Sequence, residues 1–262
     1  MIGRATRLYV TTGLTALALA LAALSGILAG TTNGDVRVAW IAVNLMSVAG
    51  AVVVQGVEQR RRERERQAAE IVAVDMRVAM NDALDPIVRQ LGRIAIAGSR
   101  RERDELREQT IPMVLYSASL LIGPERVRAC WFRLHNGRGP RRLTPELSEG
   151  RADALRTQFV EGTSSGDSVL ELLTKNTHRF CADVQAAPPP GWDAGHPHEY
   201  RTFISVPVVA GTTAFGLVSV DSLLPGDLTE GDVPLLRLLA GLLADALAYG
   251  SGGGILGGAL GG

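Results

Sequence analysis

The stretch Arg201–Ser222, RTFISVPVVAGTTAFGLVSVDS, predicts the centre of the fold. Its two runs of β-branched and aromatic residues flank a Gly-Thr-Thr segment, so we expect two strands joined by a turn at Gly211. The next segment, LTEGDVPLLRLLAGLLADALAYG (228–250), is an apolar helix in which Thr229 is the expected N-cap and Asp232 completes a capping box. A hairpin followed by such a helix indicates a sheet with a helix packed on it.

The residues upstream extend this pattern to an α+β domain. The expected elements are a helix over 100–123, a strand over Arg126–Leu134, a loop over 135–147, a helix over 166–176 opened by Asp167 or Ser168, a strand over 178–185 and an irregular loop over 186–200. This order predicts an antiparallel sheet with helices packed on one face.

Two uncharged apolar segments near the N-terminus, Leu8–Gly30 and Val38–Val57, are long enough to cross a bilayer, which takes about 20 residues. The sequence therefore predicts a transmembrane hairpin over 1–57, with the lipid bilayer as a partner. A cleaved signal peptide is the alternative for the first segment, although its apolar run is longer than such peptides usually carry.

An arginine-rich segment, QRRRERERQ (Gln59–Gln67), follows the second apolar run. Because glutamates alternate with the arginines, and because the whole chain has a formal net charge of zero, we expect no nucleic-acid binding. Arginine flanks of membrane helices stay in the cytoplasm. The predicted location is thus the inner (plasma) membrane, with the N-terminus and the C-terminal domain cytoplasmic.

The helical linker over 58–99 connects this region to the domain. It carries apolar residues at intervals of three and four, namely Val72, Met76, Ala79, Ala83 and Ile87. This stripe is either a spacer that covers the domain or the seam of a homodimer. Asp85-Pro86 is expected to end one helix and open another, with Asp85 as N-cap. A Gly-rich tail occupies 250–262.

The C-terminal half of the chain resembles a GAF domain. The resemblance rests on the strand core Val206-Pro207-Val208, the strand from Gly216 to Asp221, the helix start from Thr229 to Asp232 and the Leu/Ala-rich closing helix. It covers residues 100–249, and the PAS domain is the nearest rival fold. GAF domains are mostly sensory, so the resemblance implies a small-molecule sensor or signalling adaptor that acts through a separate output protein.

From positions in the GAF pattern, the resemblance implies that ligand-facing polar residues are Cys181, Tyr200, Arg201, Ser205, Ser219 and Asp221. Arg201 near the mouth of the site would suit an anionic ligand. The alternative is that Asp221 caps a turn and Arg201 is simply exposed. These residues do not identify a cofactor.

The chemistry-bearing residues do not predict an enzyme. The chain has two cysteines, Cys130 and Cys181, without a C-x-x-C pair, and its histidines lack partners at metal-ligand spacing. Cys130 is expected to be a buried apolar residue. Neither the Cys-His pair of bilin-binding relatives nor the Asn-Lys-x-x-Asp signature of cyclic-nucleotide-binding relatives occurs. A redox enzyme or redox sensor that uses Cys181 is one alternative, and a ligand-free structural scaffold is another.

Overall fold

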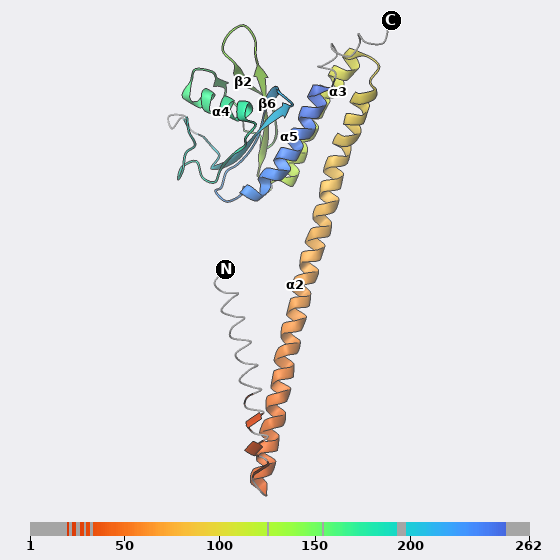
Figure 1. Cartoon of the computed structure of the whole chain (residues 1–262), viewed down its shortest axis with the longest axis vertical. Coiled ribbons are helices and arrows are strands. Elements are labelled where there is room, and N and C mark those ends of the chain that lie inside the picture. Colours follow the sequence, from red (N-terminus) through yellow and green to blue (C-terminus); the bar gives the residue numbers. More distant parts are fainter. Residues whose placement is uncertain are drawn as a thin grey trace. The chain divides into compact units, whose positions relative to one another are not determined.

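In the computed structural model of the protein, the described residues are 20, 23–24, 27–28, 30–31, 34–124, 126–153, 155–192 and 198–249 (Figure 1). The chain divides into two compact units, Met1–Arg77 and Val78–Gly262. The first unit contributes helix α2 (Asp35–Ile96), whose last residues from Val78 onward belong to the second unit. The second unit holds the sheet and the remaining helices.

None of the helices among these described residues is both long enough and apolar enough to cross a membrane. The predicted transmembrane hairpin is therefore not supported by the part of the chain that the structure describes. Most of its first span, Leu8–Gly30, lies outside the described residues, as do several side chains of Val38–Val57 and the Gly-rich tail 250–262.

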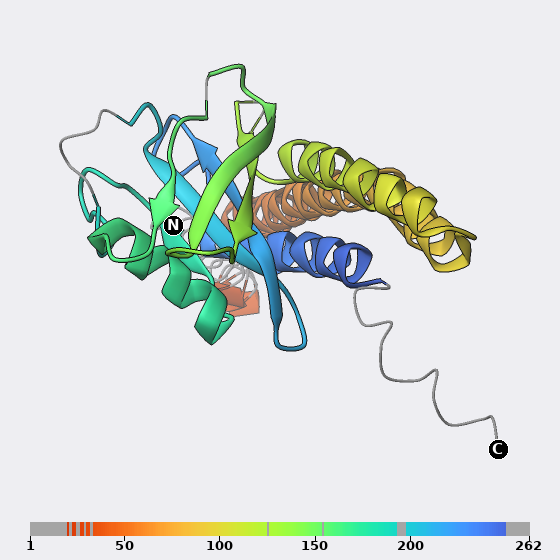
Figure 2. The same cartoon turned by 90° about the horizontal axis from the view of Figure 1, so that it is seen from above.

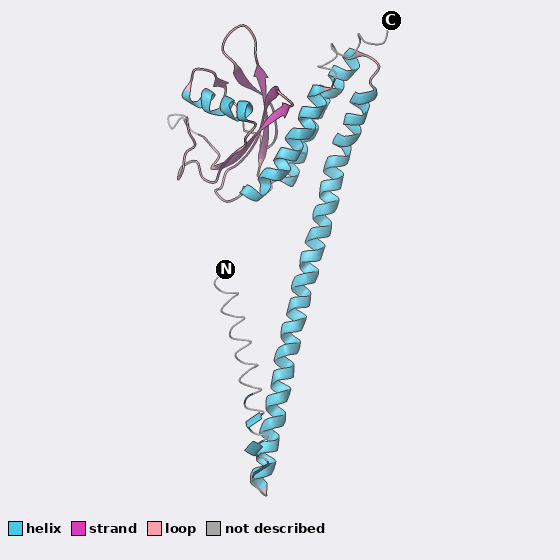
Figure 3. Ribbon diagram, viewed as in Figure 1, coloured by secondary structure: helices cyan, strands magenta, loops and turns pink. Residues whose placement is uncertain are grey.

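The second unit is built on a six-stranded antiparallel sheet of strand order β3-β2-β1-β6-β5-β4 (Figure 3). The strands are β1 (Arg128–His135), β2 (Arg142–Gly150), β3 (Phe159–Val160), β4 (Arg179–Cys181), β5 (Thr202–Ala210) and β6 (Thr213–Ser222). An antiparallel sheet with flanking helices confirms the predicted α+β class. The longest pairing, between β5 and β6, is the hairpin predicted from Arg201–Ser222.

Helices cover both faces of this sheet. Helices α3 (Arg100–Leu121) and α5 (Val233–Ala248) pack on one face, and α4 (Ser164–Lys175) packs on the other (Figure 2). The prediction of helices on one face is therefore wrong for α4. The reason lies in β1, where both faces are apolar: Trp131 joins the core beneath α3 and α5, whereas Phe132 packs with Leu170 of α4.

The core between the sheet and α5 follows the alternation of β5 and β6. Ile204 and Val206 of β5 and Val218 and Val220 of β6 are buried in it, so the residues between them face α4. Gly216 allows the closest approach in this region. A Cβ there would lie 2.1 Å from the carbonyl oxygen of Phe132 and 2.5 Å from the Trp131 ring.

The turn predicted for the hairpin is confirmed, and the predicted capping box is present, although it opens a 3₁₀ turn that precedes the last helix. Gly211 has a φ of +59°, the left-handed conformation that glycine adopts without steric cost. The Thr229 backbone N–H donates to the Asp232 carboxylate at 2.7 Å, and the reciprocal half of the capping box is also present. These residues form a short 3₁₀ turn, Glu230–Asp232, from which α5 continues.

The predicted loop over 135–147 is wrong, because residues from Arg142 onward form β2. Pro145 favoured the prediction of a loop, because proline has no backbone N–H to donate to a neighbouring strand. In the structure Pro145 pairs with Phe132 where the register shifts by a bulge, which is a place where sheets accept proline. Leu143, fully buried against α4, anchors the strand.

Helix α4 begins earlier than predicted. Its N-cap is Thr163, whose hydroxyl oxygen accepts from the backbone N–H of Gly166 at 3.0 Å. Neither Asp167 nor Ser168 is the cap. Gly166 lies so close to β3 that a Cβ would be 1.9 Å from the carbonyl oxygen of Val160, so the start of α4 is held against the sheet edge.

The predicted helix break at Asp85-Pro86 is also wrong, because α2 continues through Pro86 to Ile96. Ala83 and Ile87 are buried on either side of the proline, and the Ser117 hydroxyl of α3 donates to the Ala83 carbonyl at 3.0 Å. A proline inside a helix costs about 3 kcal/mol. Packing of this helical turn against α3 outweighs that local preference.

Candidate functional site

The sheet face beneath α4 carries two cross-strand rows of residues, fixed by the register of β1, β6, β5 and β4. The first row is Cys130, Ser219, Ser205 and Arg179, and the second is Arg128, Asp221, Phe203 and Cys181. Four of the six predicted ligand-facing residues, Cys181, Ser205, Ser219 and Asp221, therefore share this face. Strand pairing brings together residues that are far apart in the sequence, such as Arg128 and Asp221, which are 93 positions apart.

Ser205 and Ser219 form a hydroxyl pair in the middle of this face. Their oxygens are 2.9 Å apart, and the Ser219 hydroxyl donates to the Ile204 carbonyl at 3.1 Å. Because the single hydroxyl proton of Ser219 is donated to the backbone, Ser205 is the donor in the serine pair. The lone pairs of the Ser205 oxygen remain available as acceptors. Ser219 is partly exposed although its strand is in the interior of the sheet, so the sheet face is accessible to solvent above it.

Asp221 lies at one end of the face in a buried network of charges. Its carboxylate accepts from Arg128 at 3.1 and 2.9 Å and from Arg151 at 2.7 Å. Arg128 also donates to the Asp153 carboxylate at 2.6 Å. The positive charges of the two guanidiniums are balanced by the negative charges of the two carboxylates. Both oxygens of Asp221 are engaged, so it neither caps a turn nor offers an unpartnered acceptor.

Burial raises the pKa of Asp221, while the neighbouring guanidiniums of Arg128 and Arg151 favour its charged form and oppose that shift. The thiol of Cys130 lies 3.9 Å from the same carboxylate. Burial, and then the negative charge of Asp221, raise the pKa of Cys130 to about 12. Cys130 is therefore a neutral buried thiol, as the sequence predicted.

Arg128, Arg151 and Asp153 are not among the residues predicted from the sequence to form the site. Arg128 had a detectable signal, since it interrupts an apolar strand and a buried arginine needs a carboxylate partner. Arg151 and Asp153 follow β2, which was expected to be a loop, so nothing placed them near Asp221.

Tyr200 and Cys181 lie in an aromatic cluster at the other end of the second row. Tyr200 meets Trp192, His198 and Phe203 with ring centroids 5.9, 5.4 and 6.0 Å away. Burial raises the pKa of the Tyr200 hydroxyl. Cys181 is buried beside these rings, and its thiol donates to the Ala187 carbonyl at 3.4 Å. Burial also raises the pKa of Cys181, which keeps the thiol protonated.

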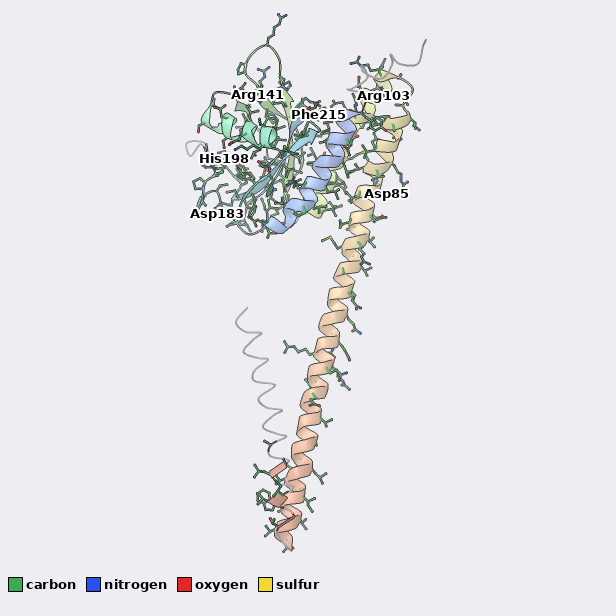
Figure 4. All side chains as sticks on the ribbon, in the orientation of Figure 1. Asp85, Arg103, Arg141, Asp183, His198 and Phe215 are labelled. Atoms are coloured by element: carbon green, nitrogen blue, oxygen red, sulfur yellow. The ribbon has the colours of Figure 1, made fainter. Side chains whose placement is uncertain are left out.

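Arg201 is engaged elsewhere. Its guanidinium donates to both carboxylate oxygens of Asp183, at 3.0 and 2.6 Å. Figure 4 marks Asp183 and His198 in the segment between β4 and β5. Arg201 therefore ties the two ends of that segment together, and a carboxylate of the chain itself satisfies it.

Arg179 of β4 lies instead in the row of the serine pair. It is partly buried and is held by α4: its Nη1 donates to the Ser168 hydroxyl at 2.9 Å and its Nη2 to the Ser168 carbonyl at 3.1 Å. Within the described residues Arg179 forms no ion pair. Burial lowers the pKa of its guanidinium, although arginine stays charged at neutral pH.

No group of three or more His, Cys, Asp or Glu residues in the described part of the chain is arranged to hold a metal ion. The sheet face therefore carries a hydroxyl pair, in which Ser219 is partly exposed and Ser205 is buried. A charge-balanced ionic network, an aromatic cluster and Arg179 lie around it.

The family comparison identifies the fold. The model of the GAF domain family matches residues 107–248, more than half of the chain. The chain therefore belongs to the GAF domain family. Among curated proteins none matches in sequence.

Solved structures with a similar fold include other GAF domains. The GAF domain of an Acinetobacter phosphoenolpyruvate-protein phosphotransferase is 16% identical, with 64% of this chain and 94% of that one covered and a TM-score of 0.43. A type II free methionine-R-sulfoxide reductase from Thermoplasma acidophilum is 21% identical (55% and 94% covered, TM-score 0.43). A methyl-accepting chemotaxis protein fragment is 18% identical (60% and 94% covered, TM-score 0.45).

Proposed function

We propose that the GAF domain of this protein is a sensor that binds a small molecule on the sheet face beneath α4. The observation that carries the proposal is the partial exposure of Ser219. This residue lies on an interior strand, between the buried residues Cys130 and Ser205 of the same row. A sheet face that served only as a core would exclude solvent there.

The chemistry of the face supports this use. Positions in the middle of a sheet usually carry β-branched or aromatic residues, whereas at this place two serine hydroxyls are in contact. Binding sites combine apolar walls with a few placed polar groups that fix the ligand's orientation. Leu170 and Leu217, both buried, border the serine pair on one side, and Phe203 with Tyr200 borders it on the other.

We also propose that the domain performs no reaction of its own and acts through a separate output protein. The redox alternative needs an activated thiol, and burial raises the pKa of both Cys130 and Cys181. The two cysteines are separated by three strand spacings, roughly 14 Å at about 4.8 Å each, and a disulfide needs Cα atoms within about 7 Å. Neither feature favours a cysteine pair that cycles between oxidation states.

The sensor proposal is tested with the full-length protein and a collection of small metabolites, by following thermal unfolding. We expect at least one compound to raise Tm, and Ser219→Val to weaken its binding at least tenfold, because the variant replaces the central hydroxyl with a methyl group and adds a second one. Thr212→Val, in the exposed turn between β5 and β6, is the matched control and should bind as the parent does. Stabilising compounds that bind Ser219→Val with undiminished affinity would refute the site.

Membrane attachment through residues 1–57 is a further part of the proposed function. The uncharged segments Leu8–Gly30 and Val38–Val57 and the arginines of Gln59–Gln67 support it. Alkaline carbonate extraction of the full-length protein from its host should leave it in the membrane pellet, and a chain that starts at Glu58 should be released. Recovery of both in the supernatant contradicts attachment. Self-association through the linker stripe stays a prediction.

A further inference from the structure

We propose that the ligand of this domain carries an anionic group, a carboxylate or a phosphate, which Arg179 binds beside the serine pair. The inference rests on the proposed function, because it assigns the ligand class of the same sheet face. It differs from the sequence prediction, which gave the anion-binding role to Arg201.

The location of Arg179 follows from the strand register. Arg179 of β4 is directly opposite Ser205 of β5, which in turn is opposite Ser219 of β6. Side chains directly opposite each other in antiparallel strands have Cβ atoms about 5 Å apart. A ligand above Ser205 is therefore one strand spacing from Ser219 on one side and one from Arg179 on the other.

The environment of Arg179 differs from that of the other partly or fully buried strand arginines. Arg128 binds the carboxylates of Asp221 and Asp153, and Arg133 binds those of Glu108 and Glu146. Arg179 is also partly buried, but in the described part of the chain it donates hydrogen bonds only to the hydroxyl and the carbonyl of Ser168. Glu171 attracts it electrostatically without forming an ion pair with it, since that carboxylate pairs with Lys175. A partly buried guanidinium with no carboxylate in hydrogen-bond contact gains a partner when a ligand supplies the negative charge.

Ser168 also fixes the guanidinium in place. Its hydroxyl accepts from Arg179 and donates to the carbonyl of Pro190 at 2.7 Å, so α4, β4 and the following segment meet at one side chain. Its backbone carbonyl accepts the second hydrogen bond. Because the arginine is held before the ligand arrives, little side-chain entropy is lost on binding.

The donors and acceptors define the ligand further. A planar guanidinium with N–H groups to spare matches a carboxylate or a phosphate, which accept two parallel hydrogen bonds. Ser205 offers an acceptor, because its proton is directed at Ser219. The ligand class is therefore a small anion that also carries an N–H or O–H donor near its charged group.

The test uses the full-length protein and three probes of one shape and different charge: salicylate, salicylamide and 2-hydroxybenzylamine. Inorganic phosphate is a fourth probe that separates a phosphate from a carboxylate preference. Binding is measured by ligand-observed NMR and by titration calorimetry. We expect salicylate or phosphate to bind at least tenfold more tightly than the neutral and cationic probes.

The variants are Arg179→Gln, Arg179→Lys and the control Arg142→Gln, which changes an exposed strand arginine. Arg179→Gln should weaken the anion at least tenfold, Arg179→Lys should retain part of the affinity, and Arg142→Gln should have no effect. Circular dichroism and the urea midpoint verify that the variants fold.

The outcomes separate this inference from the function on which it rests. Equal affinity for salicylate and salicylamide, an unchanged Arg179→Gln variant, or no binding of any anion overturns the anionic ligand. If a neutral compound binds and depends on Ser219 but not on Arg179, the sensor proposal stands and the ligand class is wrong. If no small molecule binds at all, both are wrong.

Discussion

Arg128 and Asp221 are directly opposite each other in β1 and β6, and the guanidinium binds one carboxylate oxygen through both Nε and Nη2, at 3.1 and 2.9 Å. Both side chains are 6% exposed. The pair is therefore an internal joint between two neighbouring strands, and Arg151 joins the end of β2 to it through the other carboxylate oxygen.

Replacement of Asp221 by Ala should destabilise the domain by about 3–5 kcal/mol, because it leaves two guanidiniums buried without their shared partner. Equilibrium unfolding in urea measures the loss. Lys175→Gln is the control, since its ion pair with Glu171 lies at the surface, and its urea midpoint should match the parent's. An Asp221→Ala midpoint equal to that of the parent would show that the network contributes nothing to stability.

The raised pKa of Cys130 predicts that its thiol reacts slowly with disulfide reagents. At pH 8 a thiol with a pKa of about 12, against 9.0 ordinarily, has about a thousandfold less thiolate. In Cys181→Ser protein, Cys130 should thus react with a disulfide reagent far more slowly when folded than in urea. Equal rates in both states would contradict a buried neutral thiol.

The same shift gives the sign of the pH dependence. The folded state keeps the Cys130 proton, and the unfolded state releases it above its ordinary pKa of 9.0. The stability contributed by the neutral thiol is complete below that pH and is lost as the pH rises toward about 12. Cys130→Ala should unfold with a shallower alkaline dependence over this range, measured by urea midpoints at each pH.

Alanine substitutions at two glycines should change the stability of the domain in opposite directions. Gly216→Ala places a methyl group 2.1 Å from a backbone carbonyl oxygen, so we expect a loss of about 1–3 kcal/mol from overpacking. Gly241→Ala, in α5, meets nothing within 4 Å and should stabilise the helix by up to about 1 kcal/mol. Urea unfolding of both variants tests the two signs, and a destabilised Gly241→Ala protein would mean that this face of α5 is covered.

The start of α4 gives a further prediction. Thr163→Ala removes the hydroxyl oxygen that accepts from Gly166, so it should cost about 1 kcal/mol. Ser164→Ala, at the exposed first position of the helix, should change stability by less than about 0.5 kcal/mol. If the two substitutions have equal effects in urea unfolding, Thr163 is not the cap.

The local pattern of Arg201–Ser222 and of the last helix was enough to predict the central hairpin, its turn and its capping box. Those signals are local: a left-handed glycine, strand alternation and a Thr-x-x-Asp spacing are all set by near neighbours. The predictions for β2 and Pro86 failed because proline is unfavourable locally, and distant partners decided both places. A bulge in β2 between Pro145 and Leu147 accommodates the first proline opposite Phe132, and α3 holds the turn around Pro86.

The candidate site shows the same division. Ser205, Ser219, Cys181 and Asp221 were predicted as ligand-facing from the family resemblance, and the strand register places them on one face. The partners that decide what each can do come from elsewhere in the chain: Arg151 for Asp221, Asp183 for Arg201 and Ser168 for Arg179. No periodicity in the sequence indicates such pairs, since each depends on how loops and α4 pack against the sheet.

Ser205 and Val206 are neighbours in β5, yet one faces α4 and the other belongs to the core beneath α3 and α5. The two sides of the sheet are thus separated by a single backbone. A strand that shifts to accommodate a molecule on one side must carry Val206 and Ile204 with it, and so must alter the surface on which α5 rests. In this domain β5 therefore belongs both to the face on which we propose that a ligand binds and to the surface that supports α5, so it connects the two directly.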